Sequence, residues 1–127
     1  MKRALALCLL ATAAYSAVQA QDLTTAPGAV LRGLDKVSGA VTDIEIGAGA
    51  TVTLGRLEIT LSECRYPAGD PAFNAYAHLV IRDPKAADVA FYGWMIATSP
   101  ALNALDHPRY DVWVLRCTTS AAAGTAP

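Results

Sequence analysis

Residues 50–61 read ATVTLGRLEITL, and this stretch decides the fold class. On either side of Gly55 and Arg56, apolar and polar side chains alternate with the period of two that a β-strand requires. Gly55 and Arg56 match the two-residue Gly-X loop of a type II′ hairpin. Pairing Leu54 with Leu57 then places every apolar side chain of both arms on one face. The stretch therefore predicts an antiparallel hairpin with one buried face and one face toward water.

Further strands are predicted before and after this hairpin. Apolar alternation or continuous apolar runs mark residues 41–46, 75–81, 89–98 and 110–117. Residues 89–98 are apolar on both faces, which is typical of a central strand that is covered on both sides. Residues 66–74 are rich in proline, glycine and aspartate and predict an irregular loop.

One short helix is predicted between the last two strands. Ser99 at the cap and Pro100 at the first helical position are typical of a helix start. Leu102 and Leu105 would share one face of this helix, and His107 lies at its end. Many short strands with one brief helix predict a mostly β fold, either a single antiparallel β-sandwich or a small barrel.

Residues 1–20 have the three parts of a secretory signal peptide. Lys2 and Arg3 form the basic start, an apolar run follows, and small residues precede the cleavage position after Ala20. We therefore predict that the mature protein is exported to the periplasm. The alternative is an N-terminal membrane anchor that is never cut, although the apolar run is short for a membrane span.

Cleavage would remove Cys8, so the mature chain would keep only Cys64 and Cys117. Two cysteines in an exported domain most simply form a disulfide, which here closes a loop of about 54 residues and contributes about 4 kcal/mol in the chain-entropy model. A redox-active pair is disfavoured, because such cysteines usually stand two residues apart. A zinc site that also used His78 and His107 would lack finger-like ligand spacing. We therefore predict a structural disulfide, no metal and no cofactor.

The position of Cys64 conflicts with the alternation of the hairpin. Continuing the period of two puts Cys64 on the polar face, whereas Cys117 shares parity with the apolar Trp113 and Leu115. Either the strand ends or bulges near Glu63, or the disulfide lies at the rim of the domain.

The ends of the mature chain have a different composition from its middle. Residues 21–30 are polar and contain proline and glycine, which predicts a flexible lead-in. Residues 118–127 contain only Thr, Ser, Ala, Gly and Pro, which predicts a disordered tail. One β-domain is therefore expected over residues 31–117.

The charge of the mature chain limits its partners. Loss of Lys2 and Arg3 leaves 8 basic side chains against 11 acidic ones, a net charge of about −3. A mildly acidic chain without a basic run is unsuited to nucleic acid or anionic lipid. After residue 20 the sequence has no apolar stretch long enough to span a membrane.

Three motifs resemble a family of small exported domains of unknown function, mostly from alphaproteobacteria. They are LDKVSG at 34–39, FYGWMIATSP at 91–100 and LDHPRYDVWV at 105–114, combined with the cysteine pair. The resemblance covers about residues 31–117 and implies an exported, disulfide-bearing domain, without implying a reaction or a ligand. Tyr92 stands where the family pattern more often has a small polar residue, and Ile96 where it has an aromatic one, so Tyr92 could enlarge an aromatic surface here.

The residue types of a serine hydrolase occur near the predicted helix. Ser99, His107 and either Asp106 or Asp111 could supply a nucleophile, a base and a carboxylate. The sequence has no Gly-x-Ser-x-Gly element, however, and Ser99 is expected to cap the helix. A small hydrolase that uses His107 therefore remains an alternative rather than the main hypothesis.

The main hypothesis is a non-catalytic periplasmic β-domain that binds an envelope protein, a peptide or a glycan. Aromatic and polar residues could border a groove for such a partner, although core packing is the competing interpretation for Trp94 and Trp113. The candidate binding surface comprises Tyr92, Trp94, Ser99, His107, Arg109 and Tyr110. A third hypothesis is a purely structural envelope protein.

Overall fold

The structure of the protein is a computed structural model in which residues 21–119 are described. This part of the chain forms eight β-strands and one 3-10 helix. They are β1 (Leu23–Ala26), β2 (Gly28–Asp35), β3 (Val41–Gly47), β4 (Thr51–Leu54), β5 (Leu57–Pro67), β6 (Tyr76–Arg82), β7 (Val89–Ile96), η1 (Pro100–Leu102) and β8 (Tyr110–Thr118). The predicted signal peptide and residues 120–127 of the predicted tail lie outside the described residues.

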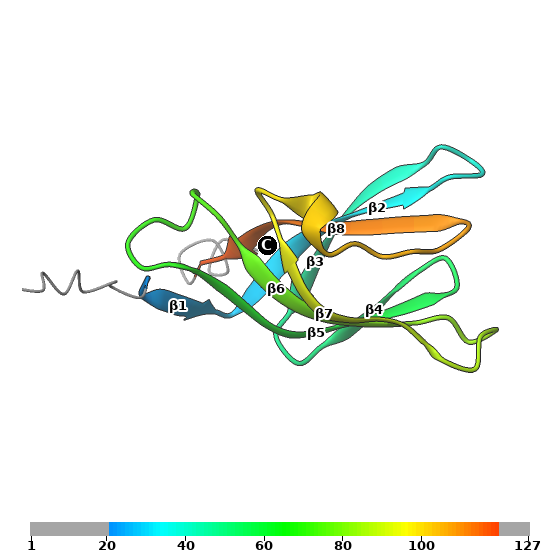
Figure 1. Cartoon of the computed structure of the whole chain (residues 1–127), viewed down its shortest axis with the longest axis horizontal. Helices are drawn as coiled ribbons and strands as arrows, with labels where there is room; N and C mark the ends of the chain where they lie inside the picture. Colours follow the sequence, from blue (N-terminus) through cyan, green and yellow to red (C-terminus); the bar gives the residue numbers. More distant parts are fainter. Residues whose placement is uncertain (1–20, 120–127) are drawn as a thin grey trace, which may run out of the picture.

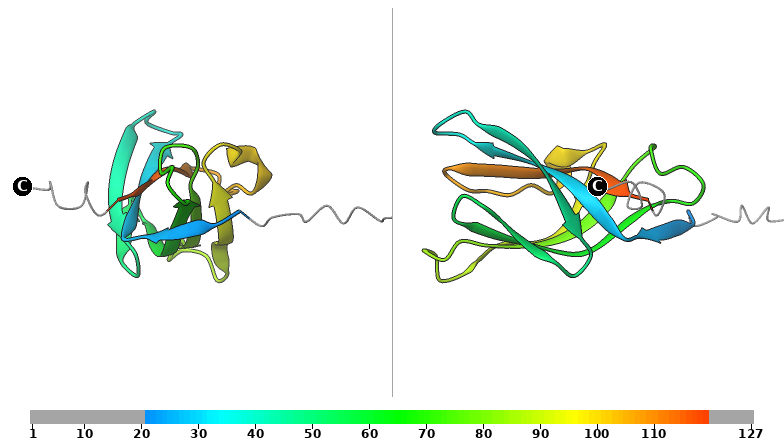
Figure 2. Two further views of the ribbon diagram at one scale, coloured as in Figure 1. Left: turned by 90° about the vertical axis from the view of Figure 1, so that its left-hand side faces the viewer. Right: turned by 180° about the vertical axis from the view of Figure 1, so that it is seen from behind.

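The strands form two antiparallel sheets that face one another (Figures 1 and 2). The large sheet has the order β1-β5-β6-β7, with β4 beside β5, and the small sheet has the order β3-β2-β8. The inner faces bury one apolar core, whose largest fully buried side chains come from β2, β5, β6, β7 and β8. A mostly β, antiparallel sandwich is thereby confirmed, and the sheets built from the described residues do not close into a barrel.

The hairpin of β4 and β5 has the predicted register. Leu54 pairs with Leu57 in the antiparallel ladder, so the apolar residues of both strands point inward. Gly55 has a φ of 57°, while no residue other than glycine has a positive φ in the described chain. A positive φ at the first loop position alone is the pattern of a type II′ turn.

A bulge in β5 resolves the position of Cys64. Leu61 pairs with Leu79, but Glu63 pairs with His78, so Ser62 is an extra residue in the ladder. The inward side therefore changes from odd to even positions, and Cys64 is fully buried. The predicted distortion near Glu63 is confirmed as a bulge within a strand that continues.

A second bulge lies in β8, and the sequence analysis missed it. Leu31 pairs with Val114 and Val30 with Arg116, which leaves Leu115 as the extra residue. Val114 and Cys117 both point into the core, and Trp113 does not. The expectation that Cys117 shares a face with Trp113 and Leu115 is therefore wrong. Both faces of β8 are apolar in sequence, so periodicity could not show which one is buried.

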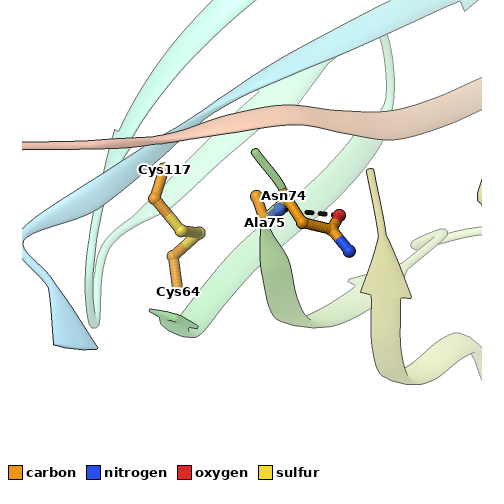
Figure 3. The surroundings of a disulfide bond; sticks show 4 residues. All are labelled: Cys64, Asn74, Ala75 and Cys117. Atoms are coloured by element: carbon orange, nitrogen blue, oxygen red, sulfur yellow. Dashed lines mark hydrogen bonds between the residues drawn. A yellow bond between two sulfur atoms is a disulfide. The ribbon is translucent and has the colours of Figure 1, made fainter. Parts of the chain in front are cut away.

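The two bulges bring Cys64 of the large sheet and Cys117 of the small sheet together in a disulfide (Figure 3). Their Cα atoms are 5.8 Å apart, and both residues belong to the core. The predicted pair is thereby confirmed. Beside it, the side chain of Asn74 accepts a hydrogen bond from the backbone N–H of Ala75 at 2.8 Å.

The expectation of a flexible lead-in over residues 21–30 is wrong. β1 pairs with β5, and β2 is the central strand of the small sheet. The small residues that resemble a linker allow close packing here, because a side chain at Gly28 would collide with the backbone oxygen of Ile46. The ordered domain therefore begins at Leu23 and not near Leu31.

The expectation of a central strand over residues 89–98 is also wrong, because β7 is an edge strand of the large sheet. Phe91 and Met95 point into the core, whereas Tyr92 is 73% and Trp94 37% exposed. Both faces of β7 are apolar, but only one of them packs into the core and the other is exposed.

The helix between β7 and β8 is shorter than predicted and ends at Leu102. Pro100 is its first residue, as expected, but the side chain of Ser99 makes no capping hydrogen bond. Leu102 is exposed and Leu105 is buried, so the two do not share a face. No helix within residues 21–119 has the length and apolar character that crossing a membrane would require.

Candidate functional site

The structure separates the six residues of the predicted binding surface into three places. The outer face of the large sheet carries Tyr92 and Trp94. Ser99 precedes η1, in the connection between the sheets. His107, Arg109 and Tyr110 lie at the end of the sandwich where the β2–β3, β4–β5 and β6–β7 turns gather (Figure 1).

An aromatic row, consisting of Tyr92, His78, Trp94 and Arg65, crosses the outer face of the large sheet. The His78 ring lies edge-on to Tyr92 and to Trp94, with centroids 4.9 and 5.2 Å apart. The guanidinium carbon of Arg65 lies 5.4 Å from the centroid of Trp94. His78 pairs with Trp94 across β6 and β7, and the bulge at Ser62 turns Arg65 outward. Three strands therefore contribute to one continuous surface.

Polar groups surround this row. The Nδ1 atom of His78 lies 3.0 Å from the hydroxyl of Ser62, and Glu63 forms an ion pair with Arg65. The Nε atom of Arg65 is buried and has no hydrogen-bond partner. The aromatic row therefore combines ring faces with donors and acceptors, a composition typical of recognition surfaces.

His107 belongs to a turn cluster, consisting of Arg56, Asp83, His107, Arg109 and Tyr110. Its Nε2 atom lies 2.9 Å from a carboxylate oxygen of Asp83. Its Nδ1 atom accepts hydrogen bonds from the backbone N–H groups of Arg109 and Tyr110, at 3.0 and 3.1 Å. Because Nδ1 accepts, the neutral ring carries its proton on Nε2 and donates it to Asp83.

Asp83 connects the β6–β7 loop to two other turns. Besides His107, it accepts hydrogen bonds from the Nε atom of Arg56 at 2.9–3.0 Å and from the backbone N–H of Lys85 at 3.0 Å. The hydrogen bond from His107, and then those from Lys85 and Arg56, lower the pKa of Asp83 to about 2 from its usual 3.8. The carboxylate is buried, yet it is fully supplied with donors.

Tyr110 fills the centre of the turn cluster. The guanidinium carbons of Arg56 and Arg109 lie 5.7 and 5.3 Å from the centroid of its ring, which also packs against Gly55. Arg109 also forms an ion pair with Asp35 of β2 at 3.0 Å. The hydrogen bond from Arg109 is the main cause that lowers the pKa of Asp35 to about 2.

The turn cluster holds loops together and does not have the geometry of a hydrolase site. His107 is 6% exposed, and both of its ring nitrogens are engaged. A general base needs a free nitrogen within reach of the nucleophile. Among residues 21–119, no group of three His, Cys, Asp or Glu side chains gathers as metal ligands would.

His78 and Arg65 are the surface residues that sequence reasoning missed. His78 alternates along β6 with the buried Ala77 and Leu79 and so lies on the outward face. Its contact with Trp94 depends on the register between β6 and β7, and the outward position of Arg65 depends on the bulge. Neither the register nor the bulge can be predicted from the sequence of one strand alone. The conflict in the alternation at Cys64 did indicate the bulge.

Comparison with known proteins identifies the family. Residues 29–117 match the family described as "Uncharacterized protein conserved in bacteria (DUF2155)". The chain is 25% identical over 87 residues to the "Uncharacterized protein RP359" of Rickettsia prowazekii (strain Madrid E). That match covers 66% of this chain and 56% of the Rickettsia protein, so the chain spans about half the length of this relative. No solved structure matches the chain. The chain belongs to the DUF2155 family.

Proposed function

We propose that this member of the DUF2155 family is an exported, non-catalytic binding module of the cell envelope. Two features support the export of the chain. Residues 1–20 have the pattern of a signal peptide that is cut after Ala20. Cys64 and Cys117 form a disulfide, and structural disulfides persist mainly in oxidising compartments such as the periplasm.

The observation that carries the binding proposal is the exposed aromatic row. Tyr92 and Trp94 contribute less to the core than rings of their size can, because a large part of each side chain faces solvent. Tyr, Trp and Arg are the residue types that most often dominate binding energy. Their mutual contacts also fix the rings before a partner arrives, which lowers the entropy cost of binding.

The outer face of the small sheet has a different character. Arg32 and Asp43 form a two-point ion pair across β2 and β3, with a shortest distance of 2.7 Å. Glu45 is exposed on the same strand as Asp43. Charged residues are depleted at the core of protein interfaces. We therefore assign the partner to the large sheet.

The other residues of the predicted surface support this role indirectly. His107, Arg109 and Tyr110 hold the turns at one end of the sheets and so keep β7 in place. Ser99 begins the connection that returns from β7 to β8. On this proposal Tyr92 and Trp94 contact the partner, and the other four residues shape the scaffold that presents them.

Site-specific crosslinking in the periplasm tests this proposal. A photoreactive phenylalanine analogue at Tyr92 is compared with the same analogue at Glu45, on the outer face of the small sheet. We expect position 92 to capture a defined product, seen as a gel shift for a protein partner or as retention in the cell-wall pellet for a glycan. Replacing Trp94 with Ala in the position-92 variant should reduce capture at least fivefold while the circular dichroism spectrum is unchanged.

Equal capture at the two positions, or none at either, contradicts the binding proposal and favours a purely structural envelope protein. Loss of an enzymatic activity in a folded His107→Asn variant would instead revive the hydrolase alternative.

A further inference from the structure

A pocket separate from the aromatic row lies between η1 and the start of β8. It has a volume of about 310 Å³, at the lower end of the range for small-molecule sites. Small apolar residues of the η1 segment form one wall, and β8 forms the other. The lining residues are Pro100, Ala101, Ala104, Asp111, Val112 and Trp113.

Asp111 and Trp113 give this pocket its chemistry. They are two residues apart on β8, so both project from the same side of the strand. Val112 and Val114 point into the core, and Asp111 and Trp113 therefore face away from it. Neither the carboxylate of Asp111 nor the indole N–H of Trp113 has a hydrogen bond or an ion pair with another residue of the described chain. An aspartate carboxylate is an anion at neutral pH and attracts cations.

Two cations near the pocket are already paired, whereas Arg116, farther along β8, is exposed and forms no ion pair among the described residues. Arg32 is opposite Trp113 in the β2–β8 ladder, but its guanidinium binds Asp43 in a two-point ion pair. Arg109 precedes β8 and binds Asp35. None of the ion pairs within residues 21–119 involves Asp111, so its charge is available to a group from outside the chain.

We propose that this pocket binds a primary ammonium group carried on a short alkyl chain. The carboxylate of Asp111 would pair with the ammonium, and the Trp113 ring would attract the same cation through its π face. Ala101, Ala104 and Pro100 would contact the methylene groups, which fit a volume of this size. A lysine side chain of a peptide and a free alkylamine share this chemistry.

Tryptophan fluorescence measures the binding directly. The sequence contains two tryptophans, so a Trp94→Phe variant reports on Trp113 alone. The mature protein is titrated with Nα-acetyl-lysine methyl ester and, in parallel, with the norleucine analogue that lacks the ammonium. We expect a saturable change with the lysine compound and an affinity at least tenfold lower for the norleucine compound.

Two variants locate the site. Asp111→Asn should weaken binding of the lysine compound at least tenfold, whereas Glu58→Gln, which removes an exposed carboxylate from β5, should leave it unchanged. Ala104→Phe should abolish binding by filling the pocket without a change of charge. Circular dichroism checks that each variant is folded.

The comparison of butylamine with a blocked Ala-Lys-Ala tripeptide distinguishes the two sources. Tighter binding of the tripeptide supports a lysine side chain of a partner, and equal or tighter binding of butylamine supports a free amine. An equal response to the lysine and norleucine compounds, or no effect of Asp111→Asn, would overturn the proposal. Crosslinking at Tyr92 is independent of either result, because that residue does not line the pocket.

Discussion

The two ends of the sandwich are held together by different chemistry, although the same strands meet at both. At one end, Cys64 of β5 and Cys117 of β8 are joined by a disulfide. At the other, Tyr110 at the start of β8 packs against Gly55, in the turn that precedes β5. A covalent link restricts the unfolded chain, whereas a polar cluster acts in the folded state and depends on all its members. The first end should therefore resist pH, and the second should not.

Removing the disulfide has the largest expected effect. We expect Cys64→Ala with Cys117→Ala to lower the free energy of unfolding by about 4 kcal/mol, because the unfolded chain regains the freedom of a loop of about 54 residues. Urea denaturation of the mature protein measures this loss. The single variant Cys117→Ala, which also loses the bridge, is the control, and a loss below about 1 kcal/mol in the double variant would show that the turn cluster alone closes the sandwich.

Replacing His107 tests the other end. His107→Ala leaves the backbone N–H groups of Arg109 and Tyr110 without their acceptor, and a stranded buried polar group costs about 1–3 kcal/mol, so we expect a total loss of about 3 kcal/mol. The measurement is again urea denaturation.

Two milder replacements separate the contribution of the hydrogen bond to Asp83 from that of the hydrogen bonds to the backbone N–H groups. His107→Asn keeps an acceptor near the position of Nδ1 but loses Asp83, and His107→Gln keeps a donor toward Asp83 but loses the acceptor. We expect the Asn variant to be the more stable of the two. The reverse order would show that Asp83 matters more than the backbone N–H groups.

Gly55→Ala should cost about 2 kcal/mol, because Gly55 has a positive φ and a methyl group there would collide with the hydroxyl of Tyr110. Gly39→Ala is the matched control, since Gly39 has a φ of 77° with nothing within 4 Å of the added carbon. Thermal unfolding of both variants compares them. Equal losses would mean that the contact with Tyr110 contributes nothing beyond the backbone term.

Acid should weaken the turn cluster and the ion pair between Asp35 and Arg109. The pKa values of Asp83 and Asp35 are about 2 in the folded protein, below the usual 3.8. The unfolded chain therefore binds more protons between these values, so stability is complete above about pH 4 and declines as the pH falls toward 2. Denaturation from pH 6 to pH 2 measures the slope. Asp83→Asn should reduce it, and the variant without the disulfide should keep it.

The sequence predicted local structure well where one strand could be judged by itself. Alternation gave the hairpin around Gly55, and the conflict at Cys64 correctly indicated a distortion near Glu63. The sequence-based prediction failed at residues 21–30. Small side chains there suggest a linker, but in the structure they permit close packing of β2. Small residues are compatible with both structures, and long-range pairing decides between them.

The candidate site was predictable only in part, for the same reason. Tyr92 and Trp94 both belonged to the expected binding surface, and alternation along a strand is enough to place them on one face. Whether the strand is central or at an edge depends on which partners it finds in the other half of the chain. Asp83 and His107 belong to loops 24 residues apart, so their contact could not be read from either loop.

One extra residue, Ser62, determines which side chains after it in β5 face the core. Before Ser62 the odd-numbered side chains of β5 face the core, whereas Glu63 and Arg65 after it face outward. The same extra residue therefore turns Cys64 inward and Arg65 toward Trp94. Deletion of this one residue would therefore turn Cys64 toward solvent and the guanidinium of Arg65 toward the core. The disulfide and the aromatic row therefore both depend on the number of residues in this strand.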